Sequence, residues 1–181
     1  TRSMIRPPAD STVAWSAATG ETRFSLPSGR ATWSRTNRWL ASDDQRGALR
    51  AMDPTTLALL GSRSSGVEIA SYLDSSPDGE SLAVSGLGGL AVLRPMDDTA
   101  QSIPLAGHQG STNCVRWSPD GRRLASAGND GTVRLWDART GAEMARFALP
   151  EEPFVWRLAW SPDGRVLATS HPRGVFCLWD V

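Results

Sequence analysis

Short runs of apolar residues, each of strand length, alternate with turn residues along the chain. One stretch shows this most clearly, with runs at 113–117, 123–127, 132–136 and 143–149. Ser118-Pro119-Asp120-Gly121 and Asn129-Asp130-Gly131 separate the first three runs. Proline presets φ, aspartate can bond its own backbone and glycine accepts a positive φ, so both separators predict hairpin turns. The stretch is therefore predicted to form four antiparallel strands without a helix.

The pattern repeats with a period of 42 or 43 residues. Trp117-Ser118-Pro119-Asp120-Gly121 returns as Trp160-Ser161-Pro162-Asp163-Gly164, and Ser76-Pro77-Asp78-Gly79 precedes it. A weaker copy contains Trp33-Ser34, and Ser11–Trp15 matches the back half of a fifth copy. Four strands per period predict an all-β propeller with four-stranded antiparallel blades. The predicted units are 1–26 (third and outer strands of a partial repeat), 27–66 and 67–106 (degenerate repeats), 107–149 (a well-formed repeat) and 150–181 (a last repeat ending at its third strand).

The well-formed unit resembles the WD-repeat, or WD40, family. The resemblance rests on the Ser-Pro-Asp-Gly turn with Gly107-His108, Leu124-Ala125-Ser126, Asn129-Asp130-Gly131 and Leu135-Trp136-Asp137. It implies a hydrogen-bonded network within the blade, made here by His108, Ser126, Asp130 and Trp136. Serine, histidine and aspartate also make up a catalytic triad. A buried network that satisfies its own polar groups and fixes the shape of the blade explains them better.

The other units keep only parts of this network. Unit 150–181 retains Thr169 and Trp179, but has Pro150-Glu151 and Arg173 at the histidine and aspartate positions. Unit 67–106 has Val84, Gly88 and Arg94 at the serine, aspartate and tryptophan positions, and unit 27–66 keeps Ser42 but has Arg46 and Met52. These departures predict blades held mainly by apolar packing.

The resemblance also implies an incomplete ring. In WD-repeat proteins an outer strand from near the N-terminus joins the last three strands, and this chain stops after Leu178-Trp179-Asp180-Val181, at the end of a third strand. The chain begins on a third strand, so we expect the C-terminal part of a larger ring, of seven blades for instance, completed by a missing N-terminal region or another chain. The alternative is a closed four-bladed ring with 22–26 as its closing strand.

Composition narrows the environment of the chain. The chain is 40% hydrophobic and 21% charged, and its net charge is zero. It therefore has no excess positive charge to attract nucleic acid or an anionic membrane. No apolar run is long enough to span a bilayer and no signal peptide begins the sequence, which predicts a cytoplasmic protein. All 19 basic residues are arginine, a bias that favours a GC-rich, bacterial genome. Two cysteines and two histidines, scattered along the chain, predict no disulfide framework, metal or cofactor.

The candidate partner-binding residues are those where the copies diverge at the ends of their first strands. Phe154 and Trp156 replace small polar residues such as Asn113, and Arg157 follows them. Aromatic residues and arginine near a channel opening are typical of contact hot spots. Asn129 occupies a turn on the same predicted surface. Alternatively, the two aromatic side chains plug the channel or pack between blades.

Three functions are compatible with these features. The first is a non-catalytic protein–protein interaction scaffold or sensor module, attached to an effector in a larger protein, with partners on the loop face of the propeller. The second is a propeller-based hydrolase or lyase, for which His171, Asp163, Glu151 and Glu152 form a poor convergent set. The third is a nucleic-acid or phosphopeptide reader that uses Arg157, Arg116 and Arg173, which zero net charge disfavours. The first function is the prediction.

Overall fold

The structure is a computed structural model that describes residues 11–15, 22–27, 30–44, 47–56, 58–93, 102–149 and 151–181, without the side chains of 11–15, 22–27, 91 and 93. Arg46, Arg94 and Pro150, named above for the network positions, lie outside this part of the chain.

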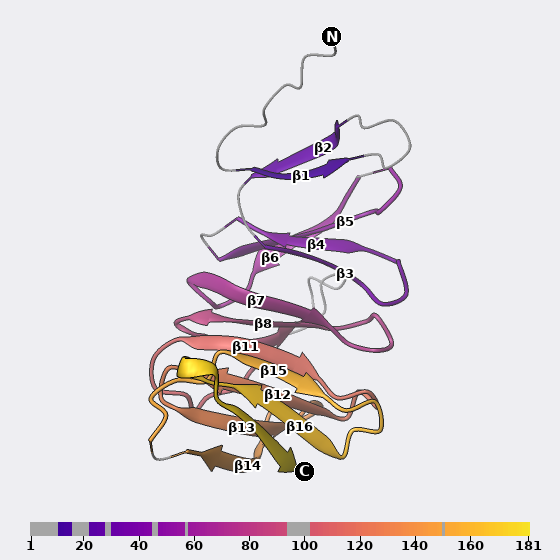
Figure 1. The fold of residues 1–181 in the computed structure, drawn as a ribbon. Coiled ribbons are helices and arrows are strands. Elements are labelled where there is room, and N and C mark those ends of the chain that lie inside the picture. Colours follow the sequence, from indigo (N-terminus) through magenta and orange to yellow (C-terminus); the bar gives the residue numbers. More distant parts are fainter. Residues whose placement is uncertain are drawn as a thin grey trace.

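The described strands form five antiparallel sheets that follow one another in sequence order (Figure 1). Sheet 1 consists of β1 (Ser11–Trp15) and β2 (Thr22–Pro27), and sheet 2 of β3 (Ala31–Trp33), β4 (Leu40–Asp43), β5 (Ala48–Met52) and β6 (Leu59–Ser64). Sheet 3 consists of β7 (Ile69–Ser75), β8 (Leu82–Leu87), β9 (Gly89–Leu93) and β10 (Ile103–Pro104). Sheet 4 consists of β11 (Thr112–Trp117), β12 (Arg123–Gly128), β13 (Thr132–Asp137) and β14 (Glu143–Ala148). Sheet 5 consists of β15 (Arg157–Trp160), β16 (Val166–Ser170) and β17 (Phe176–Asp180), with a single 3-10 turn, η1 (Pro172–Gly174), before β17.

This arrangement is the predicted all-β series of propeller blades, but the described strands do not close into a ring. Sheets 1 and 5 lie at opposite ends of the array (Figure 1). The alternative of a four-bladed ring closed by 22–26 is wrong, because β2 pairs with β1, with Ser25 opposite Val13. Sheet 5 contains three strands among the described residues. The first strands of sheets 2 to 5, namely β3, β7, β11 and β15, lie next to one another along the inner edge of the array.

The Ser-Pro-Asp-Gly turns connect the first two strands of sheets 3, 4 and 5 with the same hydrogen bonds. In sheet 4 the Ser118 hydroxyl donates to Asp120 at 2.6 Å and accepts the N–H of Arg123 at 2.9 Å. Gly121, with φ +71°, donates its N–H to the Ser118 carbonyl. Sheet 2 has no glycine here. Asn37 takes its position with φ +55° and makes the equivalent bond to the Ser34 carbonyl.

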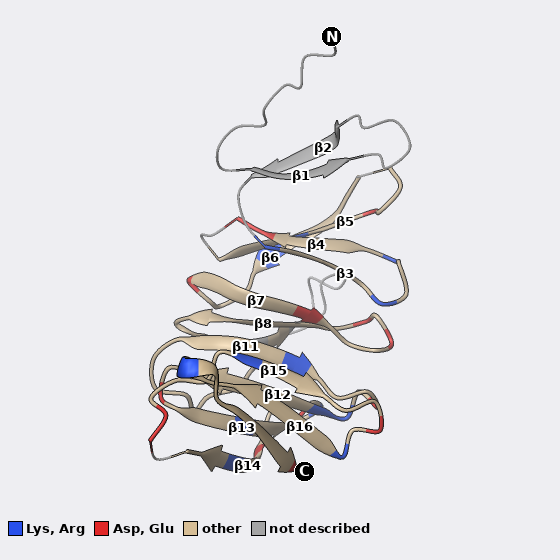
Figure 2. Cartoon of the chain, viewed as in Figure 1, with Lys and Arg blue, Asp and Glu red and all other residues tan. Residues whose placement is uncertain are grey.

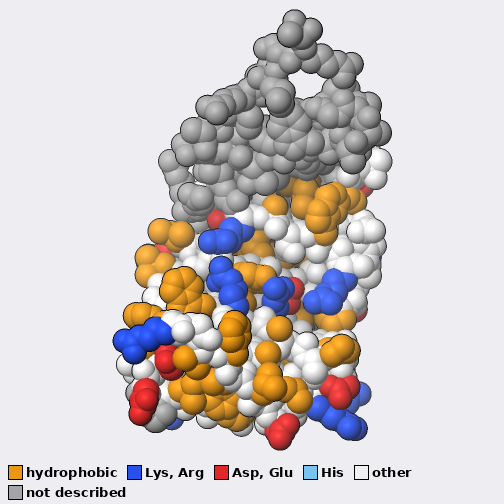
Figure 3. Space-filling view, in the orientation of Figure 1, with side chains coloured by type: hydrophobic (Ala, Val, Ile, Leu, Met, Phe, Trp, Pro, Cys, Tyr) orange, Lys and Arg blue, Asp and Glu red, His pale blue; other side chains and the backbone are white. Residues whose placement is uncertain are grey.

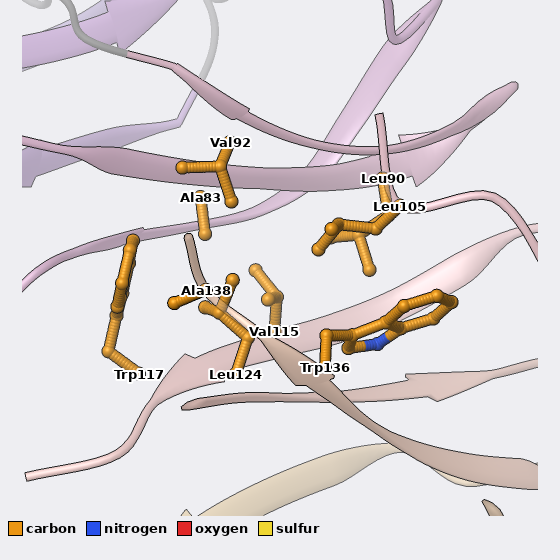
Figure 4. Packing of buried hydrophobic residues seen from close by; sticks show 9 residues of the cluster. All are labelled: Ala83, Leu90, Val92, Leu105, Val115, Trp117, Leu124, Trp136 and Ala138. Atoms are coloured by element: carbon orange, nitrogen blue, oxygen red, sulfur yellow. The ribbon is translucent and has the colours of Figure 1, made fainter. Parts of the chain in front are cut away.

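The sheets are held together by apolar side chains that fill the space between them. Figure 4 shows one such cluster between sheets 3 and 4, where four residues of one side meet five of the other. The two sides are Ala83, Leu90, Val92 and Leu105, and Val115, Trp117, Leu124, Trp136 and Ala138. A second cluster joins sheets 4 and 5 and includes Val133, Leu135, Leu158 and Leu167. Burial of apolar area of this extent is the main favourable term in folding.

Polar bonds between sheets recur with the same period. The indole N–H of Trp117 donates to the carbonyl of Asp74 at 3.1 Å, and that of Trp160 donates to the carbonyl of Arg116 at 3.2 Å. These are equivalent positions in successive sheets, so each bond fixes an inner strand to the one before it. A second pair links Trp39 to the Gly79 carbonyl and Arg123 to the Gly164 carbonyl, at 2.8 and 2.7 Å.

Sheet 3 departs from the predicted correspondence by one residue. In sheet 4 Trp136 lies opposite Leu124, whereas in sheet 3 the residue opposite the equivalent Leu82 is Leu93. The prediction that Arg94 holds the tryptophan position is therefore wrong. The cause is a shorter connection, because the β8–β9 hairpin closes at Gly86 opposite Gly89.

The turn at Asn37 gives a test of the repeated geometry. Replacing Asn37 with alanine should lower the free energy of unfolding by about 1 kcal/mol, because a Cβ-bearing residue without asparagine's local bonding is strained at positive φ. Asn37→Gly should be neutral or stabilising, and Gly121→Ala should behave like Asn37→Ala. Urea unfolding followed by circular dichroism measures all three. A loss in Asn37→Gly equal to that in Asn37→Ala would refute the backbone explanation.

Candidate interaction surface

The four residues of the predicted network meet in sheet 4. The Ser126 hydroxyl accepts the indole N–H of Trp136 at 2.8 Å and lies 2.7 Å from Nε2 of His108. Nδ1 of the same ring lies 3.0 Å from Oδ1 of Asp130. A carboxylate only accepts, so Nδ1 carries a proton, and in the neutral imidazole Nε2 accepts the hydrogen of the Ser126 hydroxyl. The two bonds fix the orientation of the ring from both sides.

Three further residues extend this network, and the sequence analysis did not include them. The Thr132 hydroxyl donates to Asp130 at 2.7 Å, and Arg134 pairs with Asp130 at 3.4 Å and with Glu143 at 2.7 Å. The Arg134 side chain is almost fully buried. Its position could have been found from the alternation of β13, which puts Thr132, Arg134 and Trp136 on one face.

The environment of the network changes the pKa of both titratable members. Burial lowers the pKa of His108, and the hydrogen bond and charge of Asp130 oppose this effect only in part. Burial by itself would raise the pKa of Asp130. The N–H of Gln109, the Thr132 hydroxyl and His108 outweigh it and hold the pKa of that carboxyl far below its usual range. The folded state thus favours neutral His108 and ionised Asp130.

Sheet 5 has no counterpart of His108 in the sequence, and His171 takes its role from a different position. His171 Nε2 lies 2.8 Å from the Thr169 hydroxyl, which accepts the indole N–H of Trp179 at 3.0 Å. His171 is one repeat beyond Gly128. A Cβ on Gly128 would lie only 2.6 Å from the His108 ring, so sheet 4 requires glycine there. Where unit 150–181 lacks the first histidine, that space is free for His171.

His171 therefore packs in the core of sheet 5 as part of this hydrogen-bonded group. It is buried, and the Asp163 carboxylate is engaged in its own turn with Ser161 at 2.6 Å. Arg173, at the aspartate position, is exposed with φ +60°. The described residues contain no group of three or more histidine, cysteine or carboxylate side chains placed to hold a metal. Both cysteines are free thiols, and burial raises the pKa of Cys114.

The predicted contact residues lie around one cavity at the inner edge of the array. Its volume is about 340 Å³, and its lining residues are Arg30, Ser71, Asn113, Asn129, Phe154, Trp156 and Arg157. Phe154 is 41% exposed and Trp156 54% exposed, so neither side chain is packed between sheets. Figure 3 shows apolar and basic side chains mixed on this face of the molecule.

The two asparagines of the cavity hold its wall in place. The Asn113 amide donates to Oδ1 of Asn129 at 2.7 Å and to the carbonyl of Val155 at 3.0 Å. Val155 is fully buried between the exposed Phe154 and Trp156. The buried residue anchors the segment, which leaves its two neighbours directed outward.

Comparison with known sequences matches two segments of the chain, 100–137 and 146–180, to the family model described as "WD domain, G-beta repeat". These segments contain β10 to β13 and β15 to β17 with their turns. These two segments are therefore similar to WD40 repeats.

Three similar proteins match parts of the chain, and two of them are named for WD repeats. The chain is 36% identical over 59 residues to the WD40 repeat-containing protein HOS15 of Arabidopsis thaliana, which covers 33% of this chain and 10% of that protein. It is 55% identical over 40 residues to WD repeat-containing protein 1 of Xenopus tropicalis, 22% of this chain and 7% of that protein. The match to Periodic tryptophan protein 2 of Saccharomyces cerevisiae is 31% over 118 residues, 64% of this chain and 13% of that protein. The chain thus spans about a tenth of the length of these relatives.

No helix in the described part of the chain has the length and hydropathy to cross a membrane.

Removing the tryptophan at the centre of the complete hydrogen-bonded network of sheet 4 should be strongly destabilising. Trp136 is fully buried, so Trp136→Ala should lower the free energy of unfolding by about 3–5 kcal/mol. Trp179→Ala should cost less, since that side chain is only partly buried. Chemical denaturation of both variants measures the difference. A near-native midpoint for Trp136→Ala would exclude the core role assigned to it.

The same network of sheet 4 should make stability depend on pH. His108 has a lower pKa in the folded chain than in the unfolded one, so the unfolded state binds the proton more tightly. The free energy of unfolding should therefore fall as pH decreases below about 6.5, the ordinary histidine value. Loss of ionised Asp130 adds to the fall only below about pH 4. Unfolding titrations at several pH values should show a flatter profile between about pH 6.5 and 5 for His108→Gln than for the wild type. Parallel profiles would contradict this assignment.

Proposed function

We propose that the chain is a non-catalytic protein-interaction module that binds a protein partner at the cavity around Phe154 and Trp156. The exposure of these two aromatic side chains beside Arg157 is the observation that carries the proposal. Large aromatic residues and arginine supply much of the binding energy in protein interfaces, and exposed apolar groups of this kind mark contact sites. The adjacent asparagine pair supplies a fixed wall against which a partner can pack.

A hydrolase or lyase function finds less support. Its candidate residues were His171, Asp163, Glu151 and Glu152. His171 bonds to Thr169 in the core and Asp163 bonds to its own turn, so these two are engaged in separate structural roles. A catalytic site needs acid, base and nucleophile within reach of one substrate atom.

We also propose that further blades complete the ring, from the same protein or from another chain. The outer face of sheet 5 supports this. Phe176 and Leu178 are 76% and 75% exposed, whereas Val133 and Leu135, one repeat earlier, are buried by the following sheet. An apolar sheet face of this kind matches the surface that another blade covers. Such an assembly fits the propeller part of a larger multidomain protein.

The proposed cell context follows from composition. The exclusive use of arginine favours a bacterial source, although the three relatives named above are eukaryotic. A cytoplasmic location would suit a scaffold with free thiols.

Partner capture tests the proposed surface. The double variant Phe154→Ala with Trp156→Ala should keep the wild-type thermal melt, because both side chains are largely exposed, and should lose most of the proteins captured from lysate of the source cell. Trp33→Ala is the matched control, since Trp33 is similarly exposed but does not line the cavity. Quantitative mass spectrometry of the captured proteins gives the comparison. Equal capture by the wild type and the double variant would refute the site.

A further inference from the structure

Four arginine side chains gather around one inner strand, although they lie far apart in the sequence. Arg30 and Arg35 come from sheet 2, Arg116 from sheet 4 and Arg157 from sheet 5, and each contacts β7. We call this set the arginine wall. Figure 3 shows basic side chains across the middle of this face, and Figure 2 places basic segments next to the acidic end of β7.

The contacts of the arginine wall run along the whole of β7. Nε of Arg30 donates to the Ala70 carbonyl at 3.3 Å near the start of the strand, and Nε of Arg35 donates to the Ser75 carbonyl at 3.3 Å at its end. Between them, the guanidinium groups of Arg116 and Arg157 lie 4.6 and 5.7 Å from the centre of the Tyr72 ring. The guanidinium of Arg116 also donates to the Tyr72 hydroxyl.

Carboxylates balance only part of this charge. Asp74 is buried, accepts the N–H of Trp117 at 2.9 Å and pairs with Arg116 at 3.4 Å and Arg35 at 3.8 Å. Burial raises the pKa of Asp74, against the opposing effect of the Trp117 N–H and the two arginines. Asp43 accepts the backbone N–H of Arg30. Even with both aspartates counted as charged, four guanidinium groups leave an excess of positive charge, on a chain whose net charge is zero.

Arg157 is the member of the wall best placed to bind a ligand. Its contacts are the Trp156 carbonyl, at 3.0 Å, and the face of Tyr72, and no carboxylate of the described residues forms an ion pair with it. A guanidinium held against an aromatic face keeps most of its N–H donors free. Arg157 also lines the cavity with Arg30, Phe154 and Trp156. Basic and apolar contacts are thus offered at one place.

We propose that the arginine wall and the cavity bind an acidic peptide segment, with carboxylates on Arg157 and Arg30 and one apolar side chain between Phe154 and Trp156. The planar guanidinium matches a carboxylate with two parallel hydrogen bonds. The cavity has room for a single large side chain, and the Ser71 and asparagine groups beside it suit a peptide backbone. Nucleic acid is disfavoured because the chain has zero net charge and four arginines can neutralise only a few phosphates. This inference rests on the proposed function and names the chemistry of its partner.

Fluorescence anisotropy with defined probes tests the inference. The main probe is a labelled peptide with aspartates and glutamates on both sides of a central phenylalanine, and its control has asparagine and glutamine in their place. The acidic peptide should bind more tightly than its control, and its affinity should fall steeply between about 50 mM and about 300 mM salt. Arg157→Gln should weaken binding about tenfold, as expected for loss of a charged hydrogen-bond pair. Arg139→Gln, which changes an exposed arginine that does not line the cavity, should leave the affinity unchanged.

Three results would overturn the inference. These are equal binding of the acidic peptide and its amide control, wild-type affinity in Arg157→Gln, and preference for single-stranded oligothymidylate over the acidic peptide. Circular dichroism melts confirm that Arg157→Gln is folded. If partner capture still depends on Phe154 and Trp156 while no acidic probe binds, the proposed interaction module stands and the acidic partner is rejected. Loss of that dependence would reject both.

Discussion

Sheets 3 and 4 bury both of their faces, and their neighbours in sequence do this. Val133 and Leu135 on sheet 4 are buried by Leu158 and Leu167 of sheet 5, while the opposite side of sheet 4 packs on sheet 3 through the cluster of Figure 4. A single sheet of three or four short strands could not supply this burial alone. The repeat in the sequence is a consequence, because each unit presents the same two apolar faces. The inner strands are brought side by side for the same reason, and the candidate site lies on them.

Polar groups inside the array are satisfied locally, so different units can reach the same packing by different means. In sheet 4 a histidine from the preceding loop bonds Ser126. In sheet 5 His171 bonds Thr169 from the position of Gly128, which carries no side chain in sheet 4 because His108 occupies that space. Both arrangements leave a tryptophan indole bonded to a hydroxyl on the second strand. Both sheets therefore keep a hydroxyl that accepts the indole N–H and lies within hydrogen-bond distance of an imidazole nitrogen.

The features predictable from the sequence were those set by local chemistry. The Ser-Pro-Asp-Gly turns and the strand runs follow from spacing within one period, and the residues that meet in sheet 4 follow from the resemblance to WD repeats. The alignment of units failed where one hairpin differs in length, as at Leu93, since a gap of one residue shifts every position after it. The alignment also missed the structural role of His171. Two changes in the same unit could have indicated it, because the first histidine is absent and a second histidine stands at the glycine position. Of the arginine wall, the sequence grouped Arg116 and Arg157 but not Arg30 and Arg35, because the packing of neighbouring sheets brings these two to β7.

The division between core and inner edge explains how one scaffold can carry a specific surface. Val155 is fully buried, and Asn113 bonds its carbonyl, so the backbone of this segment is fixed by sheet packing. The neighbours Phe154 and Trp156 contribute little to that packing because they point outward. Substitutions at such positions change what the surface presents without disturbing the clusters between sheets. A substitution of Arg157 would likewise change the charge of the surface without disturbing the core, since Arg157 lies on the face of Tyr72 and forms no ion pair in the core. A chain of zero net charge can therefore present a basic and aromatic face, provided that the sheets beneath it keep the inner strands in register.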